Sequence, residues 1–385
     1  MDKWRILVTM DRLLVDKKYS NLLVLGFVGL FLLAGRENMN ILASENADAA
    51  KMIHKQSARI LTDYRNVDGQ FPDGLIKDDA DDTHALRTAL DEGPGVVLVP
   101  PGFYRFGNAT VPPGVTLIGS GRGTVVLLSK GAKRIFYQNV NDWRIRDMLL
   151  DGGAELKSWQ IRQDLGENGV EVSGCTGFEI SGLIVNNFNG AGIKISHTAA
   201  SPYCQVAAAA NMFNIAAGGN HTGIRFDTRA EYMNASMLTC QGNIIGCTIH
   251  GGNVKVANSN FTNNLTGMLI DDHENGSHGA ISNCLINHNQ QLALLARNVV
   301  NGMTIDNCAF FGGGIRIDNC KGVSITSSII ACNVKTIGDG VNRIANNYII
   351  IQGKSFEFCP TTIIENNFTD TGPWEKTAQS NLTFP

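Results

Sequence analysis

The chain reads GVEVS at Gly169–Ser173, and the same pattern returns as GIKIS (Gly192–Ser196), GIRFD (Gly223–Asp227), GMLID (Gly267–Asp271) and GIRID (Gly314–Asp318). Apolar and polar residues alternate in each copy, which is typical of a β-strand with one buried side. A longer unit alternates with it, as GNIIGCTIHGG (Gly242–Gly252), GAISNCLINHN (Gly279–Asn289), GMTIDNCAFFG (Gly302–Gly312), GVSITSSIIAC (Gly322–Cys332) and RIANNYIIIQG (Arg343–Gly353). The joint repeat of about 20–25 residues is within the range of solenoid proteins. Because no helical pattern is interleaved, the units predict stacked parallel strands around one long apolar core.

The composition agrees with a solenoid of short strands and tight turns. Charged residues make up only 17% of the chain, and the 42 glycines suit many turns and few long amphipathic helices. The net charge of −3 does not indicate a nucleic-acid partner. An anionic substrate stays compatible, because a local patch can differ from the net charge.

The segment before the repeats contains three informative stretches: DDADDTHALRTAL (Asp78–Leu90), VVLVPPGFYRF (Val96–Phe106) and VPPGVTLIGSGRGTVVLL (Val111–Leu128). Asp81, Asp82 or Thr83 can cap a helix over His84–Leu90. This passage resembles the entry segment of the pectate-lyase-like β-helix superfamily, in which an acidic helix caps the coil. The resemblance implies an all-β fold, a right-handed parallel β-helix (solenoid) with an N-terminal capping helix, that acts on a polysaccharide.

The predicted organisation has four parts: a signal peptide or membrane anchor with linker (1–50), an N-terminal cap segment (51–95), the parallel β-helix (96–370) and a C-terminal tail (371–385). Asn21–Gly35 is almost wholly apolar and follows Arg12, Lys17 and Lys18, as in a secretion signal. The run is shorter than the roughly 20 residues of a membrane span, and an uncleaved anchor is the alternative. We therefore predict a secreted protein, extracellular or periplasmic, with membrane contact only through this segment.

Cysteines and asparagines recur within the repeat. The nine cysteines could form disulfides in an oxidising compartment, or could be buried thiols that behave as small apolar groups. Cys247, Cys284 and Cys308 fall on one position of the longer unit, which favours an internal stack. Asparagines recur at the turns, and a ladder of them would satisfy buried backbone groups. Two segments interrupt the rhythm, His197–Asn220 and His273–His278, and such insertions often emerge on the binding side of a solenoid.

The short units predict one polar face. If Ile193, Ile224 and Met268 point inward, the alternate residues point outward and form a ladder with a spacing of about 4.8 Å. A sugar chain can lie along such a ladder, although a solvated face with cross-strand salt bridges is the plainer interpretation. The face and its following turns gather nine residues: Lys194, Arg225, Asp227, Asp271, Asp272, His273, Arg297, Arg316 and Asp318.

These residues suggest two kinds of carbohydrate chemistry. Asp227 with Asp271 or Asp272 could divide the acid and base roles of glycoside hydrolysis. Alternatively, the three aspartates could hold calcium, the only cofactor that the sequence suggests, while His273 acts as the base of a β-elimination. We therefore predict catalytic roles for Asp227, Asp271, Asp272 and His273. Substrate binding is predicted for the remaining residues: Lys194, Arg225, Arg297, Arg316 and Asp318.

One motif resembles the signature of mannuronan epimerases, which are also β-helices. IDDHE (Ile270–Glu274) is similar to their DPHE motif, with Asp272 in place of proline. The resemblance implies roles for Asp271, His273 and Glu274. The tyrosine that the family uses for catalysis is replaced here by Met268.

A second set resembles the motifs of polygalacturonase-type hydrolases, in chain order. FDT, which contains Asp227, occupies the place of the family's NTD motif. The pair Asp271-Asp272 occupies the place of DD, and SHG, which contains His278, that of GHG. Asp318 stands where that family has a lysine.

The sequence thus predicts an exported enzyme that cleaves an acidic, uronate-type polysaccharide by β-elimination or hydrolysis. A non-catalytic carbohydrate-binding or adhesive β-helix is the first alternative, and a polyuronate C5-epimerase is the second. The expected partner is the polysaccharide, with no nucleic acid, and a homotrimer is compatible with the superfamily that the chain resembles.

Overall fold

The computed structural model describes residues 58–75, 80–154, 163–196, 207–272, 276–370, 372–374 and 381–383. All of them belong to one compact unit, Ala58–Pro385, and the other unit, Met1–Ser57, lies outside the described residues. The predicted signal or anchor segment is part of that other unit. Within the described ranges, no helix is long and apolar enough to cross a membrane.

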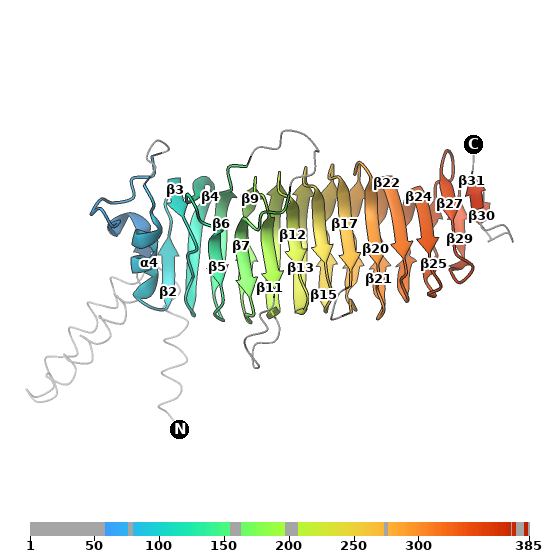
Figure 1. Ribbon diagram of the computed structural model, residues 1–385, viewed down its shortest axis with the longest axis horizontal. Coiled ribbons are helices and arrows are strands. Elements are labelled where there is room, and N and C mark those ends of the chain that lie inside the picture. The colour runs from blue at the N-terminus through green and yellow to red at the C-terminus, as the bar shows by residue number, and fades with distance from the viewer. Residues whose placement is uncertain are drawn as a thin grey trace, which may run out of the picture. The chain divides into compact units, whose positions relative to one another are not determined.

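In the described unit, strands stack side by side in successive coils and form three faces (Figure 1). Long strands turn a corner and contribute to two faces. Neighbours within each face are parallel, except at the C-terminal end. There β31 (Asn381–Thr383) and β30 (Gly372–Trp374) pair antiparallel with β27 (Ser355–Glu357) and β29 (Asn367–Thr369). The structure therefore confirms the predicted all-β, parallel β-helix.

The first face begins with β5 (Arg134–Gln138), β7 (Asn168–Ser173), β10 (Ala191–Ser196), β12 (Thr222–Phe226), β14 (Ile245–Ile249), β17 (Thr266–Asp271) and β20 (Leu292–Arg297). It continues through the later parts of β22 (Ala309–Asp318) and β24 (Ile329–Ile337) to β27 (Ser355–Glu357).

The second face begins with β1 (Arg59–Ile60), β2 (Gly95–Leu98) and the first parts of β4 (Val115–Leu128) and β6 (Arg144–Asp151). It continues through β8 (Glu179–Ser181), β11 (Ala207–Gly218), β13 (Ala230–Gln241), β15 (Val254–Ala257), β18 (Ala280–Ser282), β21 (Met303–Asp306), β23 (Val323–Thr326), β25 (Arg343–Ala345) and β28 (Ile363–Glu365).

The third face contains β3 (Gly102–Phe106), the later parts of β4, β6, β11 and β13, and the first parts of β22 and β24. Its short strands are β9 (Ile184–Asn186), β16 (Asn260–Thr262), β19 (Leu285–Asn287), β26 (Tyr348–Ile349) and β29 (Asn367–Thr369).

The capping helix is α4, Thr83–Asp91, one residue longer at each end than predicted, and a 3-10 turn, η2 (Leu61–Asp63), packs near it. Its start is held by the carboxylate of Asp81, which accepts a hydrogen bond from the Thr83 amide at 2.9 Å. Asp82 instead binds Asn66 and the amide of Arg105, which ties the helix to the first coil. The buried face of α4 therefore closes the end of the core.

One apolar core runs through the coils, and Ile193, Ile224 and Met268 are completely buried in it, as predicted. A ladder of buried asparagines runs beside the core at Asn220, Asn243, Asn264 and Asn289. The amide nitrogens of the first three donate to the side-chain oxygen of the next asparagine and to a backbone carbonyl. That of Asn289 donates to the Phe261 carbonyl. The ladder satisfies turn backbone groups that would otherwise be buried without partners, which confirms its predicted role.

The structure divides the longer units differently from the sequence prediction. Four of them form a second-face strand, a turn and a third-face strand, whereas Gly242–Gly252 contains β14 of the first face. Cys284 and Cys308 do occupy one position on neighbouring coils, and their thiols hydrogen-bond to each other, which confirms that part of the predicted stack. Cys247 lies instead on β14, so the prediction that it shares their repeat position is wrong. All three are buried, and none of the eight cysteines in the described ranges forms a disulfide.

The predicted interruption at His197–Asn220 is wrong for its second half. Ala207–Gly218 forms β11, which pairs with β13 along nearly its whole length. The alanine-rich sequence lacks the alternation that marks the other strands, so its stacking between two coils is what makes it a strand.

Candidate functional site on the first face

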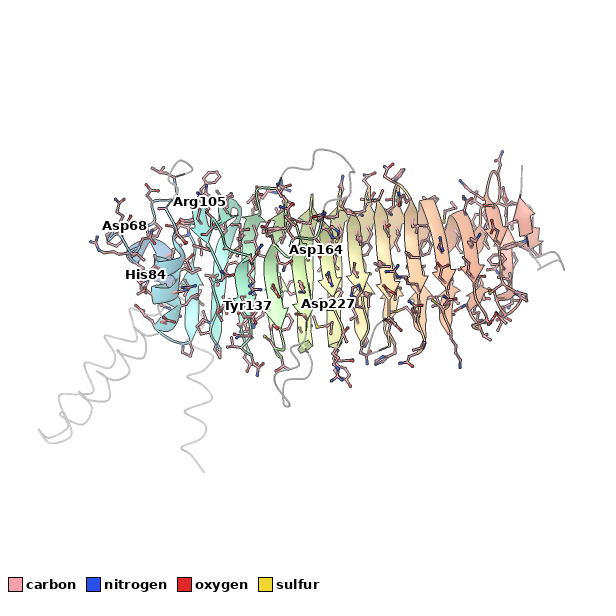
Figure 2. All side chains as sticks on the ribbon, viewed as in Figure 1. Asp68, His84, Arg105, Tyr137, Asp164 and Asp227 are labelled. Carbon is pink, nitrogen blue, oxygen red and sulfur yellow. The ribbon has the colours of Figure 1, made fainter. Side chains whose placement is uncertain are left out.

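The outward side chains of the first face form two rows that cross the strands. In the first row, Lys194 is in register with Glu171 on one side and with Arg225 on the other. Asp227 and His250 belong to the second row, directly after the ends of β12 and β14. The positions of Asp227 and of Asp164, which precedes β7, can be followed along the stack in Figure 2.

Asp227 is the centre of a cluster of charges. Its carboxylate accepts hydrogen bonds from Arg225 Nε at 2.6 Å and from His250 Nδ1 at 3.1 Å, and Lys194 Nζ lies 3.9 Å away. Lys194 also pairs with Glu171 at 3.6 Å. We call these five residues, Glu171, Lys194, Arg225, Asp227 and His250, the Asp227 cluster. Side-chain exposure is only 17% for Asp227 and 16% for His250, so the cluster is shielded from bulk water.

The environment of Asp227 favours its ionised form. Burial alone raises the pKa of a carboxyl group, but the hydrogen bond from His250 and the charges of Arg225 and Lys194 outweigh it here. The pKa of Asp227 therefore lies below its ordinary value. A carboxylate held ionised can accept protons or orient a histidine, and it is poorly suited to donate a proton as a general acid.

Four of the other predicted residues form two ion pairs. Arg297 Nη2 lies 2.6 Å from Oδ2 of Asp271, and Asn298 Nδ2 donates to Oδ1 of the same carboxylate at 3.3 Å. Arg316 Nε lies 2.6 Å from an oxygen of Asp318, on the same strand. Leu269 and Leu295 interrupt the first row before Arg316, whereas the second row runs on from Asp227 and His250 to Asp271, Arg297 and Asp318. The predicted face therefore exists, and only its first row is interrupted.

Asp272 does not join the face as predicted. One of its oxygens accepts a hydrogen bond from the Val300 amide at 3.3 Å, and the other is buried without a hydrogen-bond partner among the described residues. The chain leaves β17 after Asp271, so the side chain of Asp272 turns toward the next coil. The predicted base, His273, and the motif residue Glu274 lie outside the described residues.

The three aspartates proposed for calcium are spread along the stack. Asp227 follows β12 and Asp271 ends β17, and β14 lies between these strands, so their backbones are about 10 Å apart. Among the described residues, Asp227 and Asp271 each contact an arginine at 2.6 Å, and Asp272 does not. No group of three or more acidic, histidine or cysteine side chains suited to a metal occurs in the part of the chain that the structure describes.

The motif resemblances are only partly reflected in the geometry. Met268 is fully buried, so the position that corresponds to the epimerase tyrosine faces the core. Tyr137 does lie on the outer surface of the first face, in register with Glu171, but three strands before Asp227. His278 lies 3.9 Å from Glu231, which belongs to β13 on the second face, and not beside Asp227 or Asp271 on the first.

His250 is the residue that the sequence analysis missed. The peptide GCTIH at Gly246–His250 has the same form as GIRFD at Gly223–Asp227, with histidine in place of the last aspartate. Register confirms the match, because Arg225 pairs with Thr248 and Phe226 with Ile249. Reading this peptide as a short unit would have placed His250 beside Asp227.

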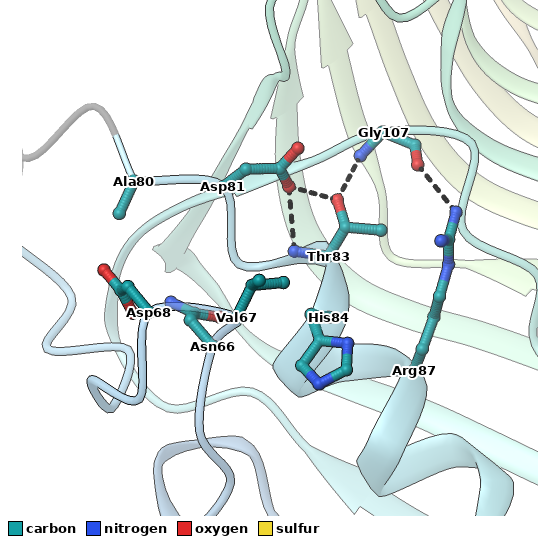
Figure 3. Close-up of a pocket in the computed structure, with 9 residues that line it drawn as sticks. All are labelled: Asn66, Val67, Asp68, Ala80, Asp81, Thr83, His84, Arg87 and Gly107. Atoms are coloured by element: carbon teal, nitrogen blue, oxygen red, sulfur yellow. Dashed lines mark hydrogen bonds between the residues drawn. The ribbon is translucent and has the colours of Figure 1, made fainter.

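A pocket of about 380 Å³ lies at the other end of the unit, beside the start of α4 (Figure 3). Asp81 binds Thr83 there, the Thr83 hydroxyl accepts a hydrogen bond from the Gly107 amide at 2.8 Å, and Arg87 reaches the Gly107 carbonyl. These polar groups join the helix to the first coil. We therefore assign the pocket to capping, and the Asp227 cluster is the candidate functional site.

The fold and site define a parallel β-helix protein with a charged outer ladder. No protein-family model and no curated protein matches the chain. Similar solved structures include the A-module of a mannuronan C-5 epimerase from Azotobacter vinelandii, at 17% identity over 81% of this chain and 95% of that one, with a TM-score of 0.43. An exopolygalacturonase from Thermotoga maritima has 12% identity over 84% and 97% of the two chains, with a TM-score of 0.46. At such identities the likeness concerns the course of the backbone and does not extend to activity.

A capsular polysaccharide depolymerase, the tailspike of Acinetobacter baumannii bacteriophage Fri1, shares 16% identity. The similarity covers 81% of this chain and 58% of the tailspike, with a TM-score of 0.48.

Asp227 should stabilise the fold near neutral pH and lose this contribution in acid. Its pKa is lower in the folded chain than in the unfolded chain, so the stabilisation is present above the unfolded value, about 3.9, and is lost as the pH falls through the folded value. We expect the difference in melting temperature between wild type and Asp227→Asn to shrink on going from about pH 6 to about pH 2. Thermal unfolding followed by circular dichroism measures both melting temperatures. A difference that stayed constant with pH would contradict the lowered pKa of Asp227.

Proposed function

We propose that the protein is an exported enzyme that cleaves an acidic, uronate-type polysaccharide by β-elimination at the Asp227 cluster. The observation that carries this proposal is the contact of His250 Nδ1 with Asp227, with two cationic side chains beside the same carboxylate. Export rests on the apolar segment Asn21–Gly35, which follows basic residues in the sequence.

His250 is the base in this proposal, and Asp227 positions it. Donation from Nδ1 to Asp227 makes Nε2 the basic nitrogen of a neutral imidazole. Nε2 would take the proton from C5 of the uronate, and the electron pair of that bond would form the C4=C5 double bond. The bond from C4 to the glycosidic oxygen then breaks, and the leaving oxygen receives the proton from the imidazolium.

Arg225 and Lys194 would bind the uronate carboxylate and make the neighbouring C5 proton more acidic. Arg225 uses Nε for Asp227 and Nη1 for Asp164, at 2.6 and 3.1 Å, and a guanidinium carries five N–H groups in all. Donors therefore remain for a substrate carboxylate. Neutralising that carboxylate is the step that proton removal from C5 needs most, because negative charge develops next to it.

Elimination fits this site better than hydrolysis. A glycoside hydrolase needs a carboxylic acid whose pKa is raised so that it can protonate the leaving oxygen. The lowered pKa of Asp227 suits the opposite role. Asp271, the other candidate, is held in an ion pair with Arg297 at 2.6 Å. An epimerase would begin with the same proton removal but would return the proton to C5 without cleaving the chain.

A binding protein without activity is the second candidate. It is favoured by the pairs Arg297–Asp271 and Arg316–Asp318, in which each outward charge already has a partner of opposite sign. Paired charges of this kind form a ladder with little net charge, which suits adhesion along a glycan more than chemistry.

The test incubates the full chain with a panel of polyuronates, and follows both the ultraviolet absorbance of the C4=C5 double bond and the release of reducing ends. The expected result is that both signals rise together and that EDTA leaves them unchanged, since the proposed residues need no metal. Reducing ends without a double bond would indicate hydrolysis. If EDTA abolished the signal and calcium restored it, the result would instead support the prediction that Asp227, Asp271 and Asp272 bind calcium. Retardation of a polyuronate in a gel with neither signal would establish the binding protein instead.

A further inference from the structure

A second surface on the unit is built differently from the Asp227 cluster. At the turns between the second and third faces, a shallow groove of about 500 Å³ runs across successive coils. One wall is formed by Asn258, Asn283 and Asn307, and the other by Leu285, Ala309 and Ile329. No residue that lines this groove carries a charge. In a protein whose first face is lined with ion pairs, this surface calls for a different ligand.

The asparagine wall is a chain of amides. Asn283 Nδ2 donates to Asn258 Oδ1 at 3.3 Å, and Asn307 Nδ2 donates to Asn283 Oδ1 at 2.6 Å. All three residues are exposed and have φ between 51° and 54°, a left-handed conformation that asparagine tolerates well. An amide has two N–H donors and two acceptor positions, so each link leaves further donors and acceptors directed outward. The wall therefore offers both, repeated at about the 4.8 Å spacing of the coils.

The apolar wall lies on the outer surface of the third face. Leu285, Ala309 and Ile329 are in register on β19, β22 and β24, and Leu285 and Ile329 are 37% and 40% exposed. The same row continues to Tyr348 and Phe368, which are also exposed. The stripe thus passes from aliphatic side chains in the groove to aromatic rings beyond it.

We propose that this groove binds an uncharged polysaccharide chain that lies across the coils. A neutral sugar presents hydroxyl groups, which both donate and accept hydrogen bonds, on its edge, and C–H groups on its ring faces. The amide wall matches the first and the apolar stripe matches the second. This binding goes beyond the proposed elimination and does not depend on it.

The uncharged lining of the groove also disfavours an acidic polysaccharide. A carboxylate held in this groove would lose water without meeting a cation, which costs free energy unless a charged partner replaces the water. The two surfaces therefore divide the ligands by charge, with uronates at the Asp227 cluster and neutral sugars at the amide wall.

The test measures retardation of the full chain in native gels that contain hydroxyethyl cellulose, galactomannan or a polyuronate. We expect at least one of the two neutral polymers to retard the wild type, and Ile329→Asp to weaken that retardation by tenfold or more. Ile363→Asp is the matched control, because Ile363 is similarly exposed at 43% but lies on β28 of the second face. It should bind like the wild type, as should Asp227→Asn. Leu285→Ser is a milder second variant, and it should weaken binding without adding a charge.

Three outcomes would overturn the proposal. In the first, neither neutral polymer retards the wild type. In the second, Ile329→Asp and Ile363→Asp weaken binding equally while circular dichroism shows that both are folded. In the third, light scattering shows an oligomer that Ile329→Asp converts to a monomer, which would make a second copy of the chain the occupant of the groove.

Discussion

Asp227→Asn should lower the rate of polyuronate elimination by about 10²–10⁴-fold, the usual contribution of an acid–base group. The carboxylate binds His250 Nδ1 at 3.1 Å, and this contact selects the tautomer in which Nε2 is basic. An asparagine can present its N–H groups to the imidazole instead, which would favour the opposite tautomer. It would also leave the charges of Arg225 and Lys194 without the carboxylate that now holds them in place.

Steady-state kinetics at several pH values distinguish a loss of His250 positioning from a loss of folded protein. A purely structural loss would lower the amount of active protein and leave the pH profile of the remainder unchanged. Loss of the tautomer should reduce kcat more than it changes KM, and should shift the pH dependence of kcat. Asp318→Asn is the matched control, since Asp318 also contacts the arginine two residues before it at 2.6 Å but lies four strands away from Asp227. Equal losses in both variants would remove the Asp227 cluster from the mechanism.

Asn264→Ala should lower the free energy of unfolding by about 3–5 kcal/mol, because it leaves several buried groups without hydrogen bonds. Asn264 Oδ1 accepts from the backbone and the side-chain amide of Asn243, at 2.9 and 3.0 Å. Its Nδ2 donates to the carbonyl of Cys240 at 2.9 Å and to Asn289. All of these groups are shielded from water, so no solvent molecule can take the place of the lost amide without a cavity of suitable shape.

Denaturant unfolding of the two purified proteins measures this effect. Asn260→Ala is the control, because Asn260 is an exposed, outward residue of β16 only four positions away. Its substitution should change stability by about 0.5 kcal/mol or less. If both variants unfolded at the same denaturant concentration as the wild type, the ladder would contribute nothing to stability.

The fold could be predicted because its determinants are local. Alternation of apolar and polar residues in GIKIS and GIRFD places the side chains of each strand on two sides, whatever the rest of the chain does. The capping helix was found within one residue at each end, since acidic residues and threonine precede its apolar face. Inward burial of Ile193, Ile224 and Met268 follows from the same alternation.

The sequence by itself therefore determined that strands stack, which side of each strand is buried, and which residue types lie outside. Only the tertiary structure decided which outward residues meet. The reason is that the coils differ in length: groups that hydrogen-bond between neighbouring coils are 19 residues apart at the Val323 amide and the Asn342 side chain, but 37 apart at the Arg134 and Glu171 side chains. With unequal turns, a fixed residue spacing does not lead from Asp227 to its partner, and only the alignment of GCTIH with GIRFD indicates His250. Stacking of β12 on β14 brings Asp227 to His250, and the exit of the chain after β17 turns Asp272 away from the face.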